Sequence, residues 1–153
     1  MSEPRGLTPD CLVETAEGPV EMSDTAKKGF AVLTRLPTGQ LGFSQLIKVE
    51  RSGPVPLVRV TLDSGHAVVA AAGHPFVRAG GDAVAARLLQ PGDTLETAYH
   101  YPAGYVPSGV TGSMRGTSIA VVSVEPAGEG EILTGTVRDT HVMFLTAGVM
   151  CGE

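Results

Sequence analysis

Several residue types are scarce or missing in this sequence, and each absence narrows the class of protein. The 153 residues include two cysteines, no tryptophan and no asparagine, and aromatic residues make up 5% of the chain. Two cysteines are too few for the disulfide framework of a small secreted domain. No apolar run approaches the roughly eighteen residues of a membrane-spanning helix. The sequence therefore indicates neither a disulfide scaffold nor a membrane protein.

An excess of positive charge is missing as well. Eleven Lys and Arg are set against sixteen Asp and Glu, which gives a formal net charge of −5 at pH 7. Proteins that bind nucleic acid concentrate basic side chains on one face. Here the basic residues are scattered, so we expect no nucleic-acid partner. Since no charged leader followed by an apolar run precedes Cys11, we expect a cytoplasmic monomer without a secretory signal.

What the sequence does contain points to an all-β fold. Twenty Gly, eleven Pro and many Val and Thr favour short strands joined by tight turns. A chain of 153 residues with 42% hydrophobic content suffices for one domain with a single core. We therefore predict one domain over 1–153. It has a flexible segment at 1–5 and a long loop at 99–117, where Gly, Pro and Ser leave no periodicity.

Alternating and β-branched runs locate the expected strands. A Gly-bearing turn at 16–18 predicts a hairpin, and Val58, Val60 and Leu62 alternate toward one face of a later strand. We expect Ser52-Gly53-Pro54 to break a strand and a turn at 128–130 to separate two others. The only helix we expect is a short one within 83–90. The other predicted strands cover 30–36, 41–50, 57–62, 66–72, 119–124 and 132–137, followed by a final pair through Phe144 and Val149.

Cysteine and histidine stand near both ends of the chain and once in its middle. Cys11 opens the first apolar run, and His74 lies in Gly73-His74-Pro75-Phe76. His141 and Cys151 lie within the last thirteen residues. A nucleophile at one end, with imidazoles available to both ends, is what a protein needs to cut its own backbone.

Five short, glycine-dependent motifs follow one another along nearly the whole chain. They are Val13-x-Thr15-x-x-Gly18, Gly29-x-x-Val32-Leu33, Val58-x-Val60-x-Leu62 leading to Gly73-His74-Pro75-Phe76, Leu88-Leu89-x-Pro91-Gly92-Asp93, and Ile132-Leu133-Thr134-x-x-Val137 with His141 and Gly148-Val149-Met150. In this order they resemble the Hint superfamily, whose members are inteins, bacterial intein-like domains and hedgehog autoprocessing domains. The end of the chain is also similar to Hint domains attached to von Willebrand A modules. The resemblance implies a horseshoe-shaped all-β fold.

The resemblance also implies an autoprocessing domain that needs no cofactor or metal and acts on its own flanking polypeptide. A cysteine, here Cys11, would attack the preceding peptide carbonyl and form a thioester. His74 would donate to the scissile nitrogen, and His141 would serve the C-terminal bond. Thr134 takes the place where inteins commonly carry Asp, and its hydroxyl would only hydrogen-bond there. Cys151 is a candidate acceptor for transesterification.

Three departures from the family pattern predict impaired or absent activity. Counting back from Val13 and Gly18 places the family's nucleophile at Gly6, which has no side chain, so that Cys11 becomes either a structural cysteine or a substitute nucleophile. Ala71 stands where the family has threonine. The chain contains no asparagine, which excludes splicing by asparagine cyclisation.

Other interpretations remain open. A lone cysteine in a strand is usually a small buried hydrophobe, His74 fits a simple turn, and His141 fits a solvated loop beside Asp139. Cys11, His74, His141 and Cys151 could converge to bind zinc, although they lack the paired spacing of a typical zinc site. The competing functions are a catalytically silent Hint fold kept as a structural or binding module, and a Cys-His protease that acts on other chains.

Overall fold

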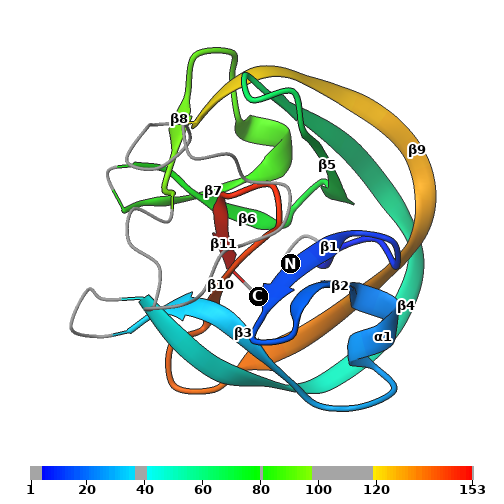
Figure 1. Cartoon of the computed structure of the whole chain (residues 1–153). Coiled ribbons are helices and arrows are strands. Elements are labelled where there is room, and N and C mark those ends of the chain that lie inside the picture. The colour runs from blue at the N-terminus through cyan, green and yellow to red at the C-terminus, as the bar shows by residue number, and fades with distance from the viewer. Residues whose placement is uncertain (1–4, 37–40, 80, 98–118, 153) are drawn as a thin grey trace.

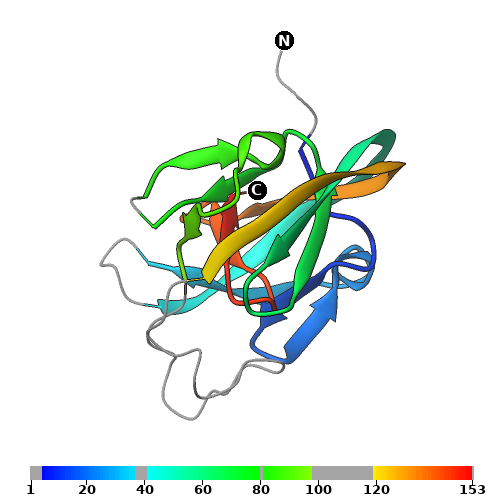
Figure 2. The same ribbon diagram turned by 90° about the horizontal axis from the view of Figure 1, so that it is seen from above.

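Two long, curved strands form the framework of the molecule (Figure 1). The computed structural model describes residues 5–36, 41–79, 81–97 and 119–152. Strand β4 (Leu41–Leu62) and strand β9 (Ile119–Val137) pair antiparallel from Leu46 opposite Val137 to Leu62 opposite Val121. In Figure 1 this pair of strands curves around the terminal strand β11 (Met150–Gly152). Figure 2, which is viewed from above, shows β9 crossing the molecule.

The strands of the described residues form two sheets in which every pairing is antiparallel. The first has the order β2-β1-β3-β4-β9-β8, with β5 also paired to β4, and the second has the order β10-β11-β6-β7. This architecture confirms the predicted all-β fold, and the hairpin expected around 16–18 is present. The further bounds are β1 Leu12–Thr15, β2 Gly18–Glu21, β3 Phe30–Arg35, β5 Ala67–Ala71, β6 Pro75–Val77, β7 Ala83–Ala85, β8 Thr94–Leu95 and β10 Val142–Phe144.

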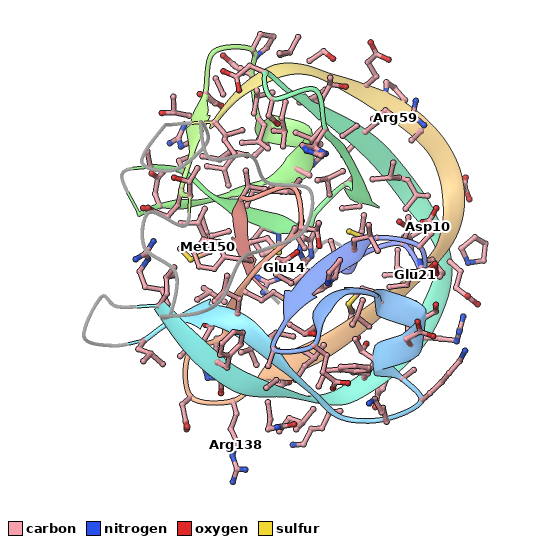
Figure 3. All side chains as sticks on the ribbon, viewed as in Figure 1. Asp10, Glu14, Glu21, Arg59, Arg138 and Met150 are labelled. Atoms are coloured by element: carbon pink, nitrogen blue, oxygen red, sulfur yellow. The ribbon has the colours of Figure 1, made fainter. Side chains whose placement is uncertain are left out.

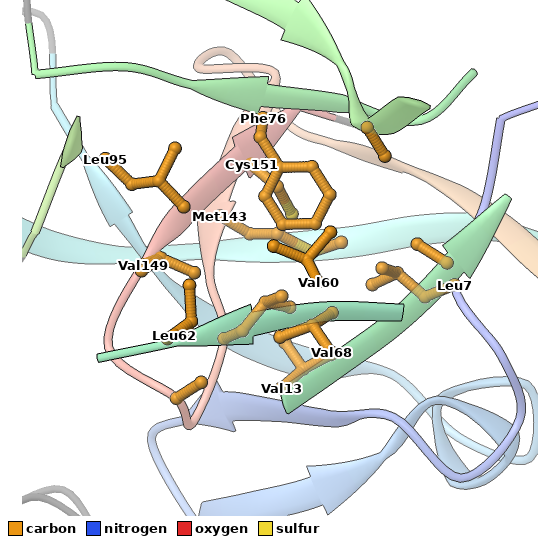
Figure 4. Packing of buried hydrophobic residues seen from close by; sticks show 14 of the residues in the cluster. Leu7, Val13, Val60, Leu62, Val68, Phe76, Leu95, Met143, Val149 and Cys151 are labelled. Carbon is orange, nitrogen blue, oxygen red and sulfur yellow. The ribbon is translucent and has the colours of Figure 1, made fainter. Parts of the chain in front are cut away.

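The core lies between the long ribbon and the second sheet. The predicted alternation in β4 is confirmed, because Val58, Val60 and Leu62 are 8%, 0% and 2% exposed. Figure 4 shows side chains from the beginning, middle and end of the chain packed together. The cluster includes Leu7 and Cys151, both fully buried, so residues near the two ends share one core.

Two predicted interruptions of strands were wrong. The Ser52-Gly53-Pro54 sequence lies inside β4 as a register shift between Ser52 and Val55, opposite β9. Gly53 has a φ of +113°, and a Cβ there would lie 2.9 Å from the Gly130 carbonyl oxygen. The turn expected at 128–130 is another irregularity within β9. Gly and Pro mark bulges here rather than chain reversals, so two long strands replace four short ones.

The helix prediction was also wrong in part. Residues 83–85 form β7, and only Ala86–Leu88 make a 3₁₀ turn, because β7 pairs with β6 and Ala86 donates its N–H to the His74 carbonyl. A four-residue helix that was not predicted, α1 (Met22–Thr25), buries Met22 and Thr25.

The expected loop at 99–117 and the first four residues of the expected flexible segment at 1–5 lie outside the described residues. No helix in the described part of the chain is long and apolar enough to cross a membrane.

Candidate functional site

His74 contacts the opening segment of the chain. Its Nδ1 atom accepts a hydrogen bond from the Gly6 N–H at 3.1 Å. The His74 backbone is fixed on both sides, since its N–H donates to the Ala71 carbonyl and its carbonyl accepts from Ala86. Gly6 is held as firmly, because its carbonyl accepts from the Ala71 N–H at 3.0 Å. The peptide nitrogen between Arg5 and Gly6 is therefore presented to an imidazole.

The surroundings keep the His74 ring neutral. The residue is 1% exposed. Burial lowers its pKa from 6.5 to about 3, and the positive charge of Arg5 adds to this decrease. The nearby Gly152 backbone opposes the decrease. Because Nδ1 accepts a hydrogen bond, the proton of the neutral ring belongs on Nε2. The Nε2 atom is buried without a hydrogen-bond partner among the described residues. His74 in this state holds the Gly6 amide and does not protonate it.

Thr134 lies near Arg5, which precedes Gly6. Leu7 exchanges two backbone hydrogen bonds with Leu133 of β9, at 3.0 and 2.8 Å. This pairing brings the next residue, Thr134, beside Arg5, and both line an open hollow of about 350 Å³. The other lining residues are Lys48, Glu50, Gly135 and Thr136.

Cys11 lines a different cavity, of about 370 Å³, whose lining includes neither His74 nor Gly6. Burial raises the pKa of its thiol from 9.0 to about 12, and the nearby charge of Asp10 adds to the rise. Asp10 lies close to the start of β1 (Figure 3). Since the thiolate is the nucleophilic form of cysteine, this environment does not activate Cys11.

Cys151 is a core residue of β11. It pairs with Met143 of β10 and with Phe76 of β6, and its side chain packs beside Phe76 in the core (Figure 4). Burial raises the pKa of its thiol well above the usual value, and Cys11 contributes further. Both cysteines are free thiols.

His141 is an exposed residue in the turn between β9 and β10. The turn is tight, with φ values of +69° at Asp139 and +60° at His141, and the His141 N–H donates to the Val137 carbonyl. The following residue, Val142, pairs with Gly152. Since the Gly152 backbone also acts on His74, the end of β11 lies close to both histidine-bearing segments.

Two residues of this site, Arg5 and Ile132, were not predicted from the sequence. Arg5 directly precedes Gly6, so its position was a usable signal. Ile132, which packs against Gly6, carried no signal, because an apolar residue in a predicted strand is ordinary. Within the described parts of the chain, no three or more His, Cys, Asp or Glu side chains lie where they could hold a metal ion.

Comparison with known proteins gives matches among solved structures. No family model and no curated protein matches the chain. A DnaB intein from Synechocystis sp. PCC 6803 superimposes with a TM-score of 0.75 at 16% identity, over 97% of this chain and 98% of that one. The intein-like domain from Clostridium thermocellum gives 0.77 at 17%, over 98% and 99%. This chain has the Hint fold.

The gp41-1 intein gives a lower TM-score of 0.69 at 17% identity, over 98% of this chain and 99% of that one. The Hint fold predicted from the five motifs is thus confirmed over nearly the whole chain. The similarity to the Hint domains of von Willebrand A proteins stays a prediction.

Proposed function

We propose that this chain is an intein-like autoprocessing domain whose substrate is its own flanking polypeptide. The bond on which it acts is the peptide between Arg5 and Gly6. The observation that carries the proposal is the 3.1 Å hydrogen bond from the Gly6 N–H to Nδ1 of His74. A buried imidazole is held against one particular backbone nitrogen, 68 residues away in sequence. The neutral ring only accepts from this N–H, and it would assist departure of the nitrogen as an amine after taking up a proton during the reaction.

The domain orients the bond but supplies no nucleophile for it. In the acyl shift of such domains, the side chain of the residue after the scissile bond attacks the preceding carbonyl, and the amide becomes an ester or thioester with a freed amine. Gly6 has no side chain to do so, and Cys11 is protonated and lines another cavity. The hollow beside Arg5 and Thr134 is open, so a small external nucleophile has access from that side. We propose that the self-processing reaction is impaired at this step.

The C-terminal bond lacks its usual route as well. The 153 residues contain no asparagine, so none of them can undergo that side-chain cyclisation. Processing at this end, with Cys151 as an acceptor, would require exposure of a thiol that is buried in the core. We therefore place the remaining reactivity at the N-terminal bond.

A fusion protein tests the proposal. A reporter domain is joined before Met1, and the purified fusion is incubated with hydroxylamine and followed by intact mass spectrometry. We expect slow cleavage at one position, after Arg5, and loss of that cleavage in His74→Ala. His66→Ala, which changes a histidine outside this contact, is the control and should cleave as the parent does.

The second candidate function is a catalytically silent Hint fold used as a structural or binding module. It is favoured by one observation, the packing of the buried Ile132 side chain against Gly6. A fusion that stays intact in hydroxylamine, or that is cleaved equally fast in His74→Ala, would contradict the autoprocessing proposal and support the silent module.

A further inference from the structure

Position 6 is closed to any side chain. A Cβ atom built on Gly6 would lie 2.8 Å from Cδ1 of Ile132 and 2.9 Å from the carbonyl oxygen of Leu133. Cβ atoms essentially never approach other heavy atoms within 3.0 Å. The backbone of Gly6 also has a φ of +138°, which residues with a side chain rarely adopt. Both packing and backbone conformation therefore require glycine here.

The space beside Gly6 has become part of the apolar core. Ile132 is 1% exposed and packs in a cluster with Leu57 and Ala71, which are 8% and 0% exposed. Ala71 donates its backbone N–H to the Gly6 carbonyl, so it also lies against the opening segment. A nucleophilic side chain at residue 6 would have to enter this cluster. Residue 6 thus lacks a nucleophilic side chain, and the space that such a side chain would need is filled by packed apolar residues.

We propose that Ile132 is the residue that bars a nucleophile from position 6. Its side chain supplies two of the three nearest contacts to the built Cβ atom, through Cδ1 at 2.8 Å and Cβ at 3.1 Å. Ile132→Ala removes the nearer of these two contacts, at Cδ1, and keeps the Cβ atom at 3.1 Å, so we expect it to relieve the crowding in part. The inference rests on the proposed function only in taking the Arg5 carbonyl as the point of attack.

The thermal stability of a set of variants tests whether Ile132 blocks a side chain at position 6. Gly6→Cys and Ile132→Ala are made singly and together, and Gly18→Cys is the matched control. Gly18 also has a positive φ, +97°, but a Cβ there meets nothing within 4 Å. We expect Gly6→Cys to lower the thermal midpoint more than Gly18→Cys does, and we expect this excess loss to shrink in the Ile132→Ala background because the two sites are in contact.

Equal losses for Gly6→Cys and Gly18→Cys would overturn the inference, as would an excess loss that Ile132→Ala leaves unchanged. If Gly6→Cys alone does not fold, recovery of soluble, cooperatively unfolding protein in the double variant supports the inference. Failure of that recovery, with Ile132→Ala itself folded, contradicts it.

The same variants in the reporter fusion give a chemical readout with dithiothreitol. The introduced sulfur would attack the Arg5 carbonyl carbon, the C–N bond to residue 6 would break, and the nitrogen would take up a proton. A dithiothreitol thiolate would then attack the thioester carbon and displace the introduced thiol. We expect cleavage in the double variant at least about tenfold faster than in Gly6→Cys, a difference of about 1.4 kcal/mol in activation free energy.

The two readouts separate the two proposals. Stability coupling without any cleavage would uphold the role of Ile132 and contradict the proposed function. Cleavage that is equally fast in Gly6→Cys alone would uphold the proposed function and overturn the role of Ile132.

Discussion

At the scale of single residues, His74 couples the stability of the protein to pH. An unfolded histidine takes up a proton near pH 6.5, whereas the folded protein protonates His74 only near pH 3. Below pH 6.5 the unfolded state therefore binds more protons than the folded state. The free energy of unfolding should fall as the pH drops from 6.5 toward 3, by up to about 1.4 kcal/mol per pH unit from this residue.

His74→Gln should remove this contribution, because an amide does not titrate and its oxygen can still accept from the Gly6 N–H. Urea unfolding at several pH values measures how the free energy of unfolding changes with pH. The pH values run from about 7 to about 4.5, because this range includes the pKa of a free histidine and lies above that of the buried one. The control is Thr94→Val, which changes no titratable group at an exposed position, and it should keep the slope of the parent. Identical slopes in His74→Gln and the parent would show that the folded protein does not exclude the proton from His74.

The sequence predicted neither the direction of the hydrogen bond at His74 nor the environment of Gly6. The family resemblance implied that His74 donates to the scissile nitrogen, whereas in the structure its Nδ1 atom accepts from the Gly6 N–H. Enclosure by Ile132 depends on which side chain of β9 lies opposite residue 6, and register across 126 positions is a tertiary property. The same reason hid the cavity around Cys11, whose walls come from four separate segments of the chain.

At the scale of elements, Thr34 in β3 fixes the turn that carries His141. The residue is fully buried, and its hydroxyl lies 2.7 Å from the Thr140 hydroxyl and 2.7 Å from the Val142 carbonyl oxygen. Thr34→Val keeps the shape but leaves these polar groups with fewer partners, so we expect the free energy of unfolding to fall by about 1–3 kcal/mol.

Thr94→Val, at an exposed position in β8, is the matched control and should change stability by less than about 0.5 kcal/mol. Chemical denaturation measures both variants. Equal effects would mean that the Thr34 hydroxyl does not stabilise the turn.

Strands could be predicted from the sequence where buried and exposed residues alternate. They could not be predicted where β4 and β9 continue through bulges. The alternation at Val58, Val60 and Leu62 follows from one buried face, and sequence shows it directly. A glycine such as Gly53 has the same local preference in a turn as in a bulge, so only pairing with β9 distinguishes the two. Residues 83–85 likewise have helical composition, and pairing with β6 overrides it.

At the scale of the whole molecule, the opening segment joins parts of the sheet that are distant in sequence. Leu7 forms bridges with Leu133 of β9 and with Ala70 of β5, and its side chain is 0% exposed in the main core. Strands β5 and β9 both pair with β4, so Leu7 ties together two neighbours of the long strand. The contact between Gly6 and His74 depends on this anchor, because residue 6 is adjacent to it.

Leu7→Ala should therefore affect both stability and the site. We expect a loss of about 2–5 kcal/mol in the free energy of unfolding, as for other fully buried leucines, against a small loss for Leu12→Ala, where the side chain is 44% exposed. Hydrogen exchange should accelerate at the Ala71 amide, which donates to Gly6, and at the Leu133 amide, which donates to Leu7. If both amides kept the protection seen in Leu12→Ala, the opening segment would be held by something other than Leu7. The hydrogen bond at His74 would then have to anchor the chain by itself.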